Sequence, residues 1–278
     1  MAVPLGPVKQ HIRGAVDTAV ERVKERATEL FSSEIASTGN GTASPFHKLL
    51  FPEAKVFSSF ERALSAALGK AFEYIAADIA QATYGNGTHD YKFFGDISPE
   101  TITLIENITN SYRGRAGIRI PPDTEIEIKR ICELVEASRA SCVTRQLKSD
   151  VYFVDDEGVE NYLQIKTPMP NYDTCAAVKT QILQFYAVRF GKAQRVRALA
   201  GFPHNPNGLV GQYAWPPLRY FLDPKRDWFA RGRKLMGPGL WNFLGNSDST
   251  YDDLLECFYE VSVERKDGLM ELLKTTTI

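Results

Sequence analysis

The stretch KSDVYFVDDEGVENYLQIKTPMPN, residues 148–171, decides the fold. It begins with a β-branched and aromatic run at 151–154, which the turn residues DDEG follow at 155–158. A second strand pattern covers 159–165, so the stretch predicts a β-hairpin. Two prolines then end the second strand, because proline donates no ladder hydrogen bond.

The hairpin brings three different polar groups to one of its ends. Asp150 opens the first strand and Lys166 closes the second, and the strand period of two puts Gln164 on the same face as Lys166. Carboxylate and amide oxygens suit a hard divalent cation, and a lysine beside a metal can position water and offset charge on phosphorus. This chemistry serves phosphodiester hydrolysis. On spacing alone, a solvated hairpin whose polar residues merely face water fits slightly better.

Three segments resemble a nuclease family. The hairpin resembles the core of PD-(D/E)xK nucleases, with Asp150 at the first acid and Gln164-Ile165-Lys166 at the (D/E)xK segment, although the family has an acid where this chain has Gln164. QIKTPMPN at 164–171 resembles the xIKTxKPN segment of TdeIII-type type II restriction endonucleases. GRKLMGPGLWNFLGNSDSTYDDLLECF at 232–258 resembles the basic strand, Trp-x-Phe-x-Gly turn and helix of the same family. The resemblance runs from about Phe57 to the C-terminus.

The resemblance implies a Mg²⁺-dependent type II restriction endonuclease that cleaves double-stranded DNA at a short site and leaves 5′-phosphate ends. LGKAFEYIA, within a helical pattern at 57–82, resembles the first helix of the nuclease core, whose glutamate faces the metal site. The resemblance as a whole implies that Glu73, Asp150 and Gln164 hold Mg²⁺ and that Lys166 orients the attacking water. Without the resemblance, the usual interpretation of Glu73 is a surface residue paired with Lys70.

Basic residues gather near Trp228, Phe229 and Trp241 and in a loop before residue 122. A basic and aromatic cluster suits phosphate contacts and groove entry, and arginine can bind guanine edges. A basic surface strand with its aromatics in the core fits the later cluster equally well, and a solvated loop fits the earlier one. The residues predicted to bind DNA are Arg113, Arg115, Asn171, Arg226, Arg231, Arg233 and Lys234.

Length, net charge and cysteine spacing limit which functions the chain can have. The chain has 278 residues and a net charge of −1, so a nucleic-acid surface must be a local patch. Its four cysteines lack CxxC spacing, which indicates neither a zinc site nor a disulfide framework and fits a reducing cytoplasm. We expect no membrane association, because no apolar stretch has the length of a signal peptide core or a span, and no nucleotide cofactor, because GxxxxGK[ST] is missing.

The order of elements predicts an α/β fold, namely a restriction-endonuclease-like core with a mixed central sheet flanked by helices and an N-terminal helical appendage. We expect an appendage at 1–50 and a nuclease domain at 51–278 that contains the DNA-recognition elements. The expected elements are helices at 8–31, 59–82, 124–140 and 174–190, the hairpin, a strand at 196–201, a basic β segment at 228–236, and a helix or strand at 250–261; residues 84–122 are expected to be loop-rich.

Three functions remain open from the sequence. The first is the restriction endonuclease, expected to be a homodimer because two-fold symmetric sites are read by two-fold symmetric proteins. The second is a non-cleaving DNA-binding protein on a decayed nuclease core, which Gln164 favours because an amide offers a cation less charge than a carboxylate. The third is a structure-selective repair nuclease.

Overall fold

The computed structural model describes residues 3–34, 52–113, 121–137, 142–190, 195–208, 212–213 and 215–275. The chain divides into two compact units. Unit 1 contains residues 1–3 and 76–251, and unit 2 contains residues 4–75 and 252–278.

Unit 1 is built on a four-stranded sheet with the order β1-β2-β3-β4. The strands are β1 (Thr88–Ile97), β2 (Val143–Val154), β3 (Glu160–Ile165) and β4 (Val196–Gly201). β2 pairs antiparallel with both β1 and β3, whereas β3 and β4 are parallel. This mixed sheet confirms the predicted α/β class.

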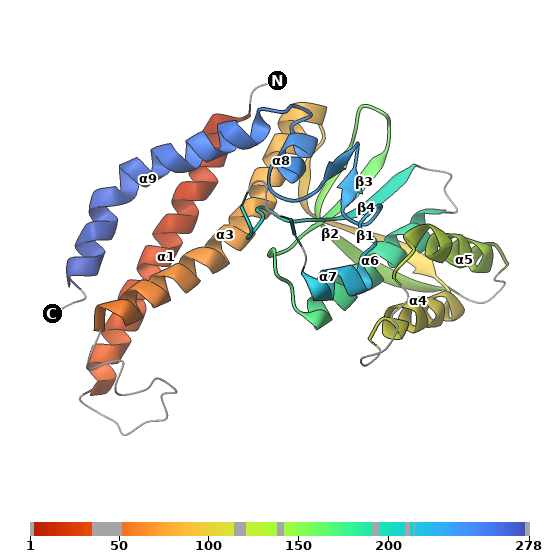
Figure 1. The fold of residues 1–278 in the computed structure, drawn as a ribbon, viewed down its shortest axis with the longest axis horizontal. Coiled ribbons are helices and arrows are strands. Elements are labelled where there is room, and N and C mark those ends of the chain that lie inside the picture. The colour runs from red at the N-terminus through yellow and green to blue at the C-terminus, as the bar shows by residue number, and fades with distance from the viewer. Residues whose placement is uncertain are drawn as a thin grey trace. The chain divides into compact units, whose positions relative to one another are not determined.

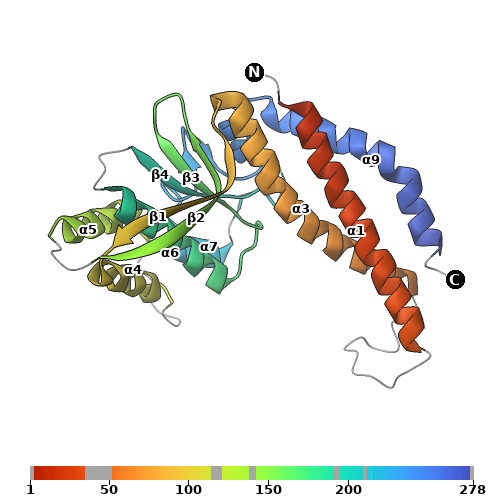
Figure 2. The same ribbon diagram turned by 180° about the vertical axis from the view of Figure 1, so that it is seen from behind.

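Helices cover both faces of the sheet (Figures 1 and 2). On one face, α4 (Pro99–Ser111), α5 (Thr124–Ala137) and α6 (Tyr172–Phe190) enclose the main core around Tyr162 and Phe185, whose rings stack at 4.8 Å. On the other face, α8 (Pro238–Leu244) carries Phe243, whose ring centroid lies 5.8 Å from that of Phe153. Because both faces are covered, every residue of β3 is buried.

The β2–β3 hairpin forms as predicted. Asp155 shapes its turn, since the Asp155 carboxylate accepts hydrogen bonds from the backbone N–H groups of Glu157 and Val159, both at 3.0 Å. Gly158 takes the positive φ of 70° that the turn requires. The position of Asp150 differs from the prediction: β2 begins at Val143, so Asp150 lies inside the strand. The polar residues before it are held in extended form by pairing with β1.

Residues 84–122 were expected to be loop-rich, and this expectation is wrong. They contain β1 and α4. The mixed sequence THDYKFFGDI becomes a strand because β2 supplies a ladder partner along its length. Ser98 caps α4 by accepting a hydrogen bond from the Thr101 N–H at 3.2 Å, and Pro99 fills the first turn.

The later elements follow the predictions closely. β4 has the predicted bounds, and the basic β segment is a short hairpin of β5 (Phe229–Ala230) and β6 (Arg233–Lys234). A short helix that was not predicted, α7 (Pro216–Phe221), precedes it. The final segment, expected to be helix or strand, is the helix α9 (Thr250–Thr275).

Unit 2 is helical. It contains α1 (Leu5–Glu34), the first part of α3 (Pro52–Tyr84) and nearly all of α9. Ion pairs join α1 to α9, among them Arg13 with Glu264 at 2.7 Å and Arg265 with Asp17 at 2.8 Å. The N-terminal helical region is confirmed, while the functional boundary after residue 50 stays a prediction.

Candidate active site

Asp150, Gln164 and Lys166 meet where β2 and β3 separate. Val151 and Leu163 form the last backbone-paired position at this end of the hairpin. Beyond it, side chains bridge the strands: Asp150 Oδ2 accepts the Ile165 N–H at 2.9 Å, and Gln164 Nε2 donates to the Lys148 carbonyl oxygen at 3.0 Å. The carboxylate and the amide are therefore both fixed by the backbone.

Lys166 completes this cluster. Its Nζ lies 2.6 Å from Asp150 Oδ2, and its side chain is 24% exposed, whereas Asp150 and Gln164 are buried. The backbone N–H of Lys166 donates to the Gly201 carbonyl oxygen of β4 at 3.0 Å. Asp150 Oδ1 and Gln164 Oε1 make no hydrogen bond within the described residues, so these two oxygens are left for a cation.

The loop after Lys166 is held from outside the hairpin. Trp215 Nε1 donates to the Pro170 carbonyl oxygen at 2.7 Å, and the Tyr213 hydroxyl donates to that of Pro168. Asn171 ends the loop by capping α6, because its Oδ1 accepts the Thr174 N–H at 2.8 Å. The predicted DNA contact of Asn171 would therefore have to use its amide nitrogen.

Glu73 lies on the part of α3 that belongs to unit 2, whereas Asp150 belongs to unit 1. Its carboxylate forms an ion pair with Lys70 at 2.7 Å. This pair is the surface arrangement that the sequence left open. The role of Glu73 at a metal stays a prediction.

β1 carries a carboxylate that the sequence analysis missed. Asp90 lies opposite Asp150, because the flanking pairs are His89 with Val151 and Tyr91 with Ser149. Its φ is 53°, an uncommon value for a residue with a side chain. A hydrogen bond from Lys148 lowers the pKa of Asp90 to about 2. The alternation of aromatic residues along YKFF would have indicated a strand here.

The oxygens of Asp150 and Gln164 match part of what Mg²⁺ requires. Mg²⁺ keeps several waters and takes one or two carboxylates together with substrate phosphate. Across the described ranges, no three His, Cys, Asp or Glu side chains gather closely enough to hold a metal. Asp150 and Gln164 therefore fit a hydrated cation that shares its shell with phosphate, and do not form a complete protein cage.

The residues predicted to bind DNA are spread over unit 1. Arg231 contacts Asp156 and holds the pKa of that carboxyl below its usual value. Arg233 and Arg113 form ion pairs with Asp248 and Asp173, at 2.7 and 2.8 Å. Lys234 and Arg226 are exposed, and Arg115 lies outside the described residues.

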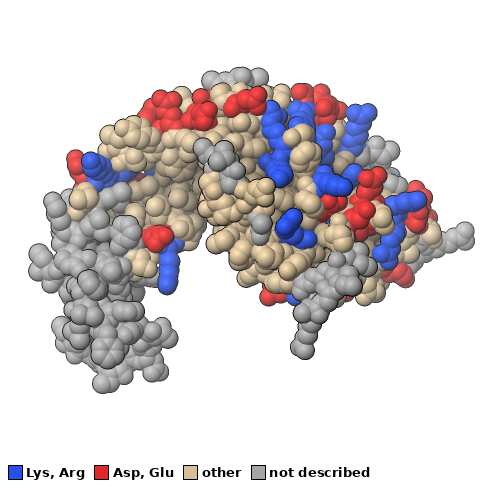
Figure 3. Space-filling view, in the orientation of Figure 1, with Lys and Arg blue, Asp and Glu red and all other residues tan. Residues whose placement is uncertain are grey.

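The aromatic residues near these cations are divided between core and surface. Trp228 and Trp241 are buried, at 4% and 1% exposure, as the alternative interpretation of a basic surface strand requires. Phe229 is 36% exposed. Lys and Arg side chains gather over β3 and β4, next to acidic ones (Figure 3).

A family model described as "Type II restriction endonuclease, HinfI" matches residues 8–262. The chain belongs to this HinfI family. The match includes most of α1 and the first half of α9, so the similarity to restriction endonucleases, which the sequence indicated from about Phe57 onward, begins near the N-terminus. The mixed sheet with its flanking helices is accordingly a restriction-endonuclease-like fold.

Three restriction enzymes of Herpetosiphon aurantiacus are similar to this HinfI-family protein. Type II restriction enzyme HgiCII is 24% identical over 277 residues, covering 96% of each chain. Type II restriction enzyme HgiEI is 23% identical over 274 residues, also covering 96% of each chain. Type II restriction enzyme HgiBI is 23% identical over 237 residues, covering 84% of this chain and 82% of its own. In the described parts of the chain, no helix combines the length and apolar character that a bilayer crossing requires.

Proposed function

We propose that this protein is a Mg²⁺-dependent endonuclease with PD-(D/E)xK chemistry, which hydrolyses double-stranded DNA at a specific site and leaves 5′-phosphate ends. One observation carries the proposal. A carboxylate, an amide oxygen and an ammonium group, from Asp150, Gln164 and Lys166, meet at one end of a hairpin. They do so in a chain of a type II restriction endonuclease family.

Each residue has a distinct role in this proposal. Asp150 Oδ1 and Gln164 Oε1 would hold the cation. When bound, Mg²⁺ would neutralise phosphate charge and lower the pKa of a bound water. The Lys166 ammonium, anchored by Asp150, would orient the attacking water and offset negative charge on the phosphoryl oxygens.

A second carboxylate has two candidates. Glu73 is implied by the resemblance to the first helix of the nuclease core, and Asp90 is supported by its place opposite Asp150 on the neighbouring strand. Asp90 would first have to release the ion pairs with Lys148 and Lys92, at 2.5 and 3.3 Å. The narrower TdeIII-type subtype, a cytoplasmic location and a homodimer belong to the same proposal.

Incubation with plasmid DNA and Mg²⁺ tests the function. We expect discrete fragments from the wild type. Asp150→Ala should abolish cleavage while leaving specific DNA binding largely intact, because it removes both a metal ligand and repulsion of the phosphate. A wild-type cleavage rate for Asp150→Ala would show that the centre is assigned wrongly.

The amide of Gln164 favours a second function, a DNA-binding protein that no longer cleaves. For that protein, the wild type and Asp150→Ala would bind the same DNA fragment and neither would cut it. A repair nuclease would instead nick DNA according to its structure, with no fixed sequence.

A further inference from the structure

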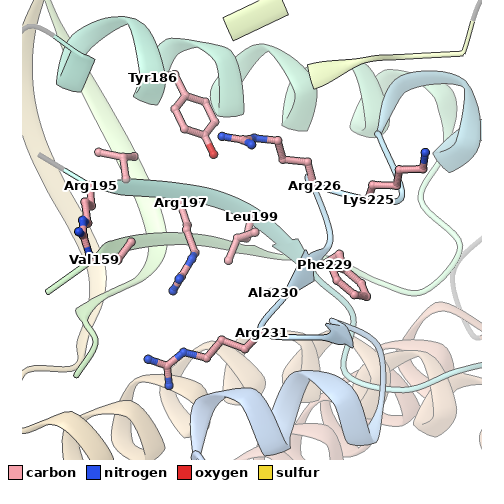
Figure 4. Close-up of a pocket in the computed structure, with 11 residues that line it drawn as sticks. Val159, Tyr186, Arg195, Arg197, Leu199, Lys225, Arg226, Phe229, Ala230 and Arg231 are labelled. Carbon is pink, nitrogen blue, oxygen red and sulfur yellow. The ribbon is translucent and has the colours of Figure 1, made fainter. Parts of the chain in front are cut away.

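A basic pocket lies beside the edge strand β4, toward the hairpin turn. Its volume is about 430 Å³. It is lined by Arg195 and Arg197 of the β4 segment, by Lys225 and Arg226, and by Arg231 of the β5–β6 turn (Figure 4). The pocket size is within the range of small-molecule sites, but five cations in its lining indicate an anionic ligand.

Carboxylates satisfy only part of this charge. Arg197 bonds to Asp155 at 2.5 Å and to Glu157 at 2.7 Å, and Arg231 contacts Asp156. These three acids come from the hairpin turn. Arg195, Lys225 and Arg226, in contrast, have no carboxylate partner among the described residues. Three exposed cations of the same pocket are therefore available to an anion that enters from solvent.

The inner wall is held in place before any ligand arrives. The Asp155 side chain is fully buried and also accepts the N–H groups of the turn, so it fixes Arg197 rigidly. The guanidinium of Arg226 points toward the Tyr186 hydroxyl (Figure 4). Planar guanidinium groups fixed in this way match the oxygens of phosphate and lose little entropy on binding.

The pocket is separate from the proposed cleavage centre. Arg195 lines the far end of the pocket and precedes Val196, which pairs with Glu160, whereas Ala200 pairs with Gln164. At a strand rise of roughly 3.3 Å per residue, Arg195 is on the order of 17 Å along the strand from the level of Gln164, whereas Leu199, which pairs with Leu163, lines the end of the pocket nearer the centre. This distance is about half of one turn of B-DNA, roughly 34 Å. One bound duplex can therefore place one phosphate at each site.

We propose that this pocket binds a DNA backbone phosphate that is not cleaved, and so positions the duplex relative to Asp150. The inference rests on the proposed function for its source of phosphate. It adds Arg195 and Lys225 to the DNA contacts, and it assigns Arg226 and Arg231 to a single phosphate subsite. A free phosphate is the other source with the same chemistry.

The test compares two double variants with equal charge change. Arg195→Ala/Lys225→Ala removes two pocket cations that have no carboxylate partner within the described residues. Arg130→Ala/Arg145→Ala removes two exposed cations of unit 1 that do not line the pocket. Binding of a DNA fragment that contains the mapped cleavage site is measured over a range of salt concentrations, with Ca²⁺ replacing Mg²⁺. Calorimetry with inorganic phosphate is run in parallel.

We expect the slope of log K against log salt to become shallower by about 0.9 per lost phosphate contact in the pocket variant only. When the duplex is shortened so that it no longer reaches the pocket, the salt slopes of the pocket variant and the wild type should be equal. Equal slopes for the pocket variant, the control variant and the wild type overturn the proposal, and so does a loss of inorganic phosphate binding with an unchanged DNA slope. Plasmid cleavage by the wild type separately tests the proposed function, since the slope does not depend on cutting.

Discussion

In the proposed centre, the side chain of Gln164 would perform two tasks that a carboxylate cannot combine. Its Nε2 donates to the Lys148 carbonyl oxygen, which joins β3 to β2 beyond the last ladder pair. An ionised carboxylate in the same place would set two acceptors against each other, and it would lose the bond. The amide thus stabilises the strand junction, and as a ligand it would give the cation less charge than a carboxylate.

Substitution of Gln164 should therefore separate metal binding from stability. Gln164→Glu should bind Mg²⁺ more tightly than the wild type and should melt at a lower temperature without Mg²⁺, because its carboxylate faces the Lys148 carbonyl oxygen. Gln164→Ala should bind Mg²⁺ about 10- to 100-fold more weakly and should lose more single-turnover activity than Gln164→Glu. Calorimetry, thermal unfolding with and without Mg²⁺, and single-turnover cleavage measure these effects. Wild-type behaviour of Gln164→Ala in all three would place Gln164 outside the metal shell.

The sequence predicted this cluster because its members are close along the chain. A hairpin brings Asp150, Gln164 and Lys166 together by local pairing, and strand alternation decides their face. Asp90 could not be predicted, since its place opposite Asp150 depends on the pairing of β1 with a strand more than fifty residues later. Glu73 depends on tertiary placement in the same way, and only a family resemblance indicates it.

At the scale of elements, β1 and α3 offer alternative second carboxylates. Glu73→Gln and Asp90→Asn are nearly isosteric and each removes one charge. The variant that removes a metal ligand should lower single-turnover cleavage by about 10- to 100-fold and should need more Mg²⁺ for half-maximal rate. The other variant should weaken ion pairs, with Lys70 for Glu73 and with Lys92 and Lys148 for Asp90, and its Mg²⁺ dependence should equal that of the wild type. If both keep wild-type Mg²⁺ dependence, neither is a ligand.

A buried charge network joins α5 and α6 to the segment before β5. Lys179 is fully buried and forms ion pairs with Glu127 at 2.5 Å and Asp227 at 2.9 Å. The Thr124 hydroxyl also accepts a hydrogen bond from Lys179, at 2.5 Å. Burial by itself lowers the pKa of Lys179, but the Asp227 and Glu127 carboxylates outweigh burial and hold this pKa above its ordinary value. A helical pattern alone gave no sign of this lysine's role, because its partners come from α5 and from the segment before β5.

Removing Lys179 should destabilise unit 1 strongly. Lys179→Met leaves two buried carboxylates without their cation and should cost about 3–5 kcal/mol in the free energy of unfolding. Lys129→Met is the matched control on α5, where the exposed pair with Glu133 spans 4.0 Å, and it should change stability little. Urea unfolding of both variants measures the difference. Equal unfolding midpoints would show that the network contributes nothing.

At the scale of the whole molecule, a nearly neutral chain concentrates its charge locally. The net charge is −1, yet five cations line one pocket in unit 1. In unit 2, ion pairs join α1 to α9, and each helix supplies both cations and acids. Composition therefore predicted that DNA binding requires a patch, but it could not predict where the patch lies. The HinfI-family match covers elements of both units, so neither unit is outside the family.

The number of cleavage centres leads to the last prediction. Each chain has one Asp150–Gln164–Lys166 cluster, while a double-strand break requires hydrolysis of two strands of opposite direction. Two copies related by a two-fold axis can present one centre to each strand at once, so we expect a dimer to be the active species. Co-expression of wild-type and Asp150→Ala chains with different tags, followed by purification through both tags, would isolate the mixed dimer.

This mixed dimer should convert supercoiled plasmid to the nicked circle and stop there, because only one of its centres can act. A dimer of wild type with Arg130→Ala, prepared in the same way, should produce linear DNA, since Arg130 is an exposed residue of α5 outside the proposed centre. If no species carries both tags and wild-type chains alone linearise the plasmid in a single binding event, the enzyme acts as a monomer. In that case one centre must serve both strands in turn.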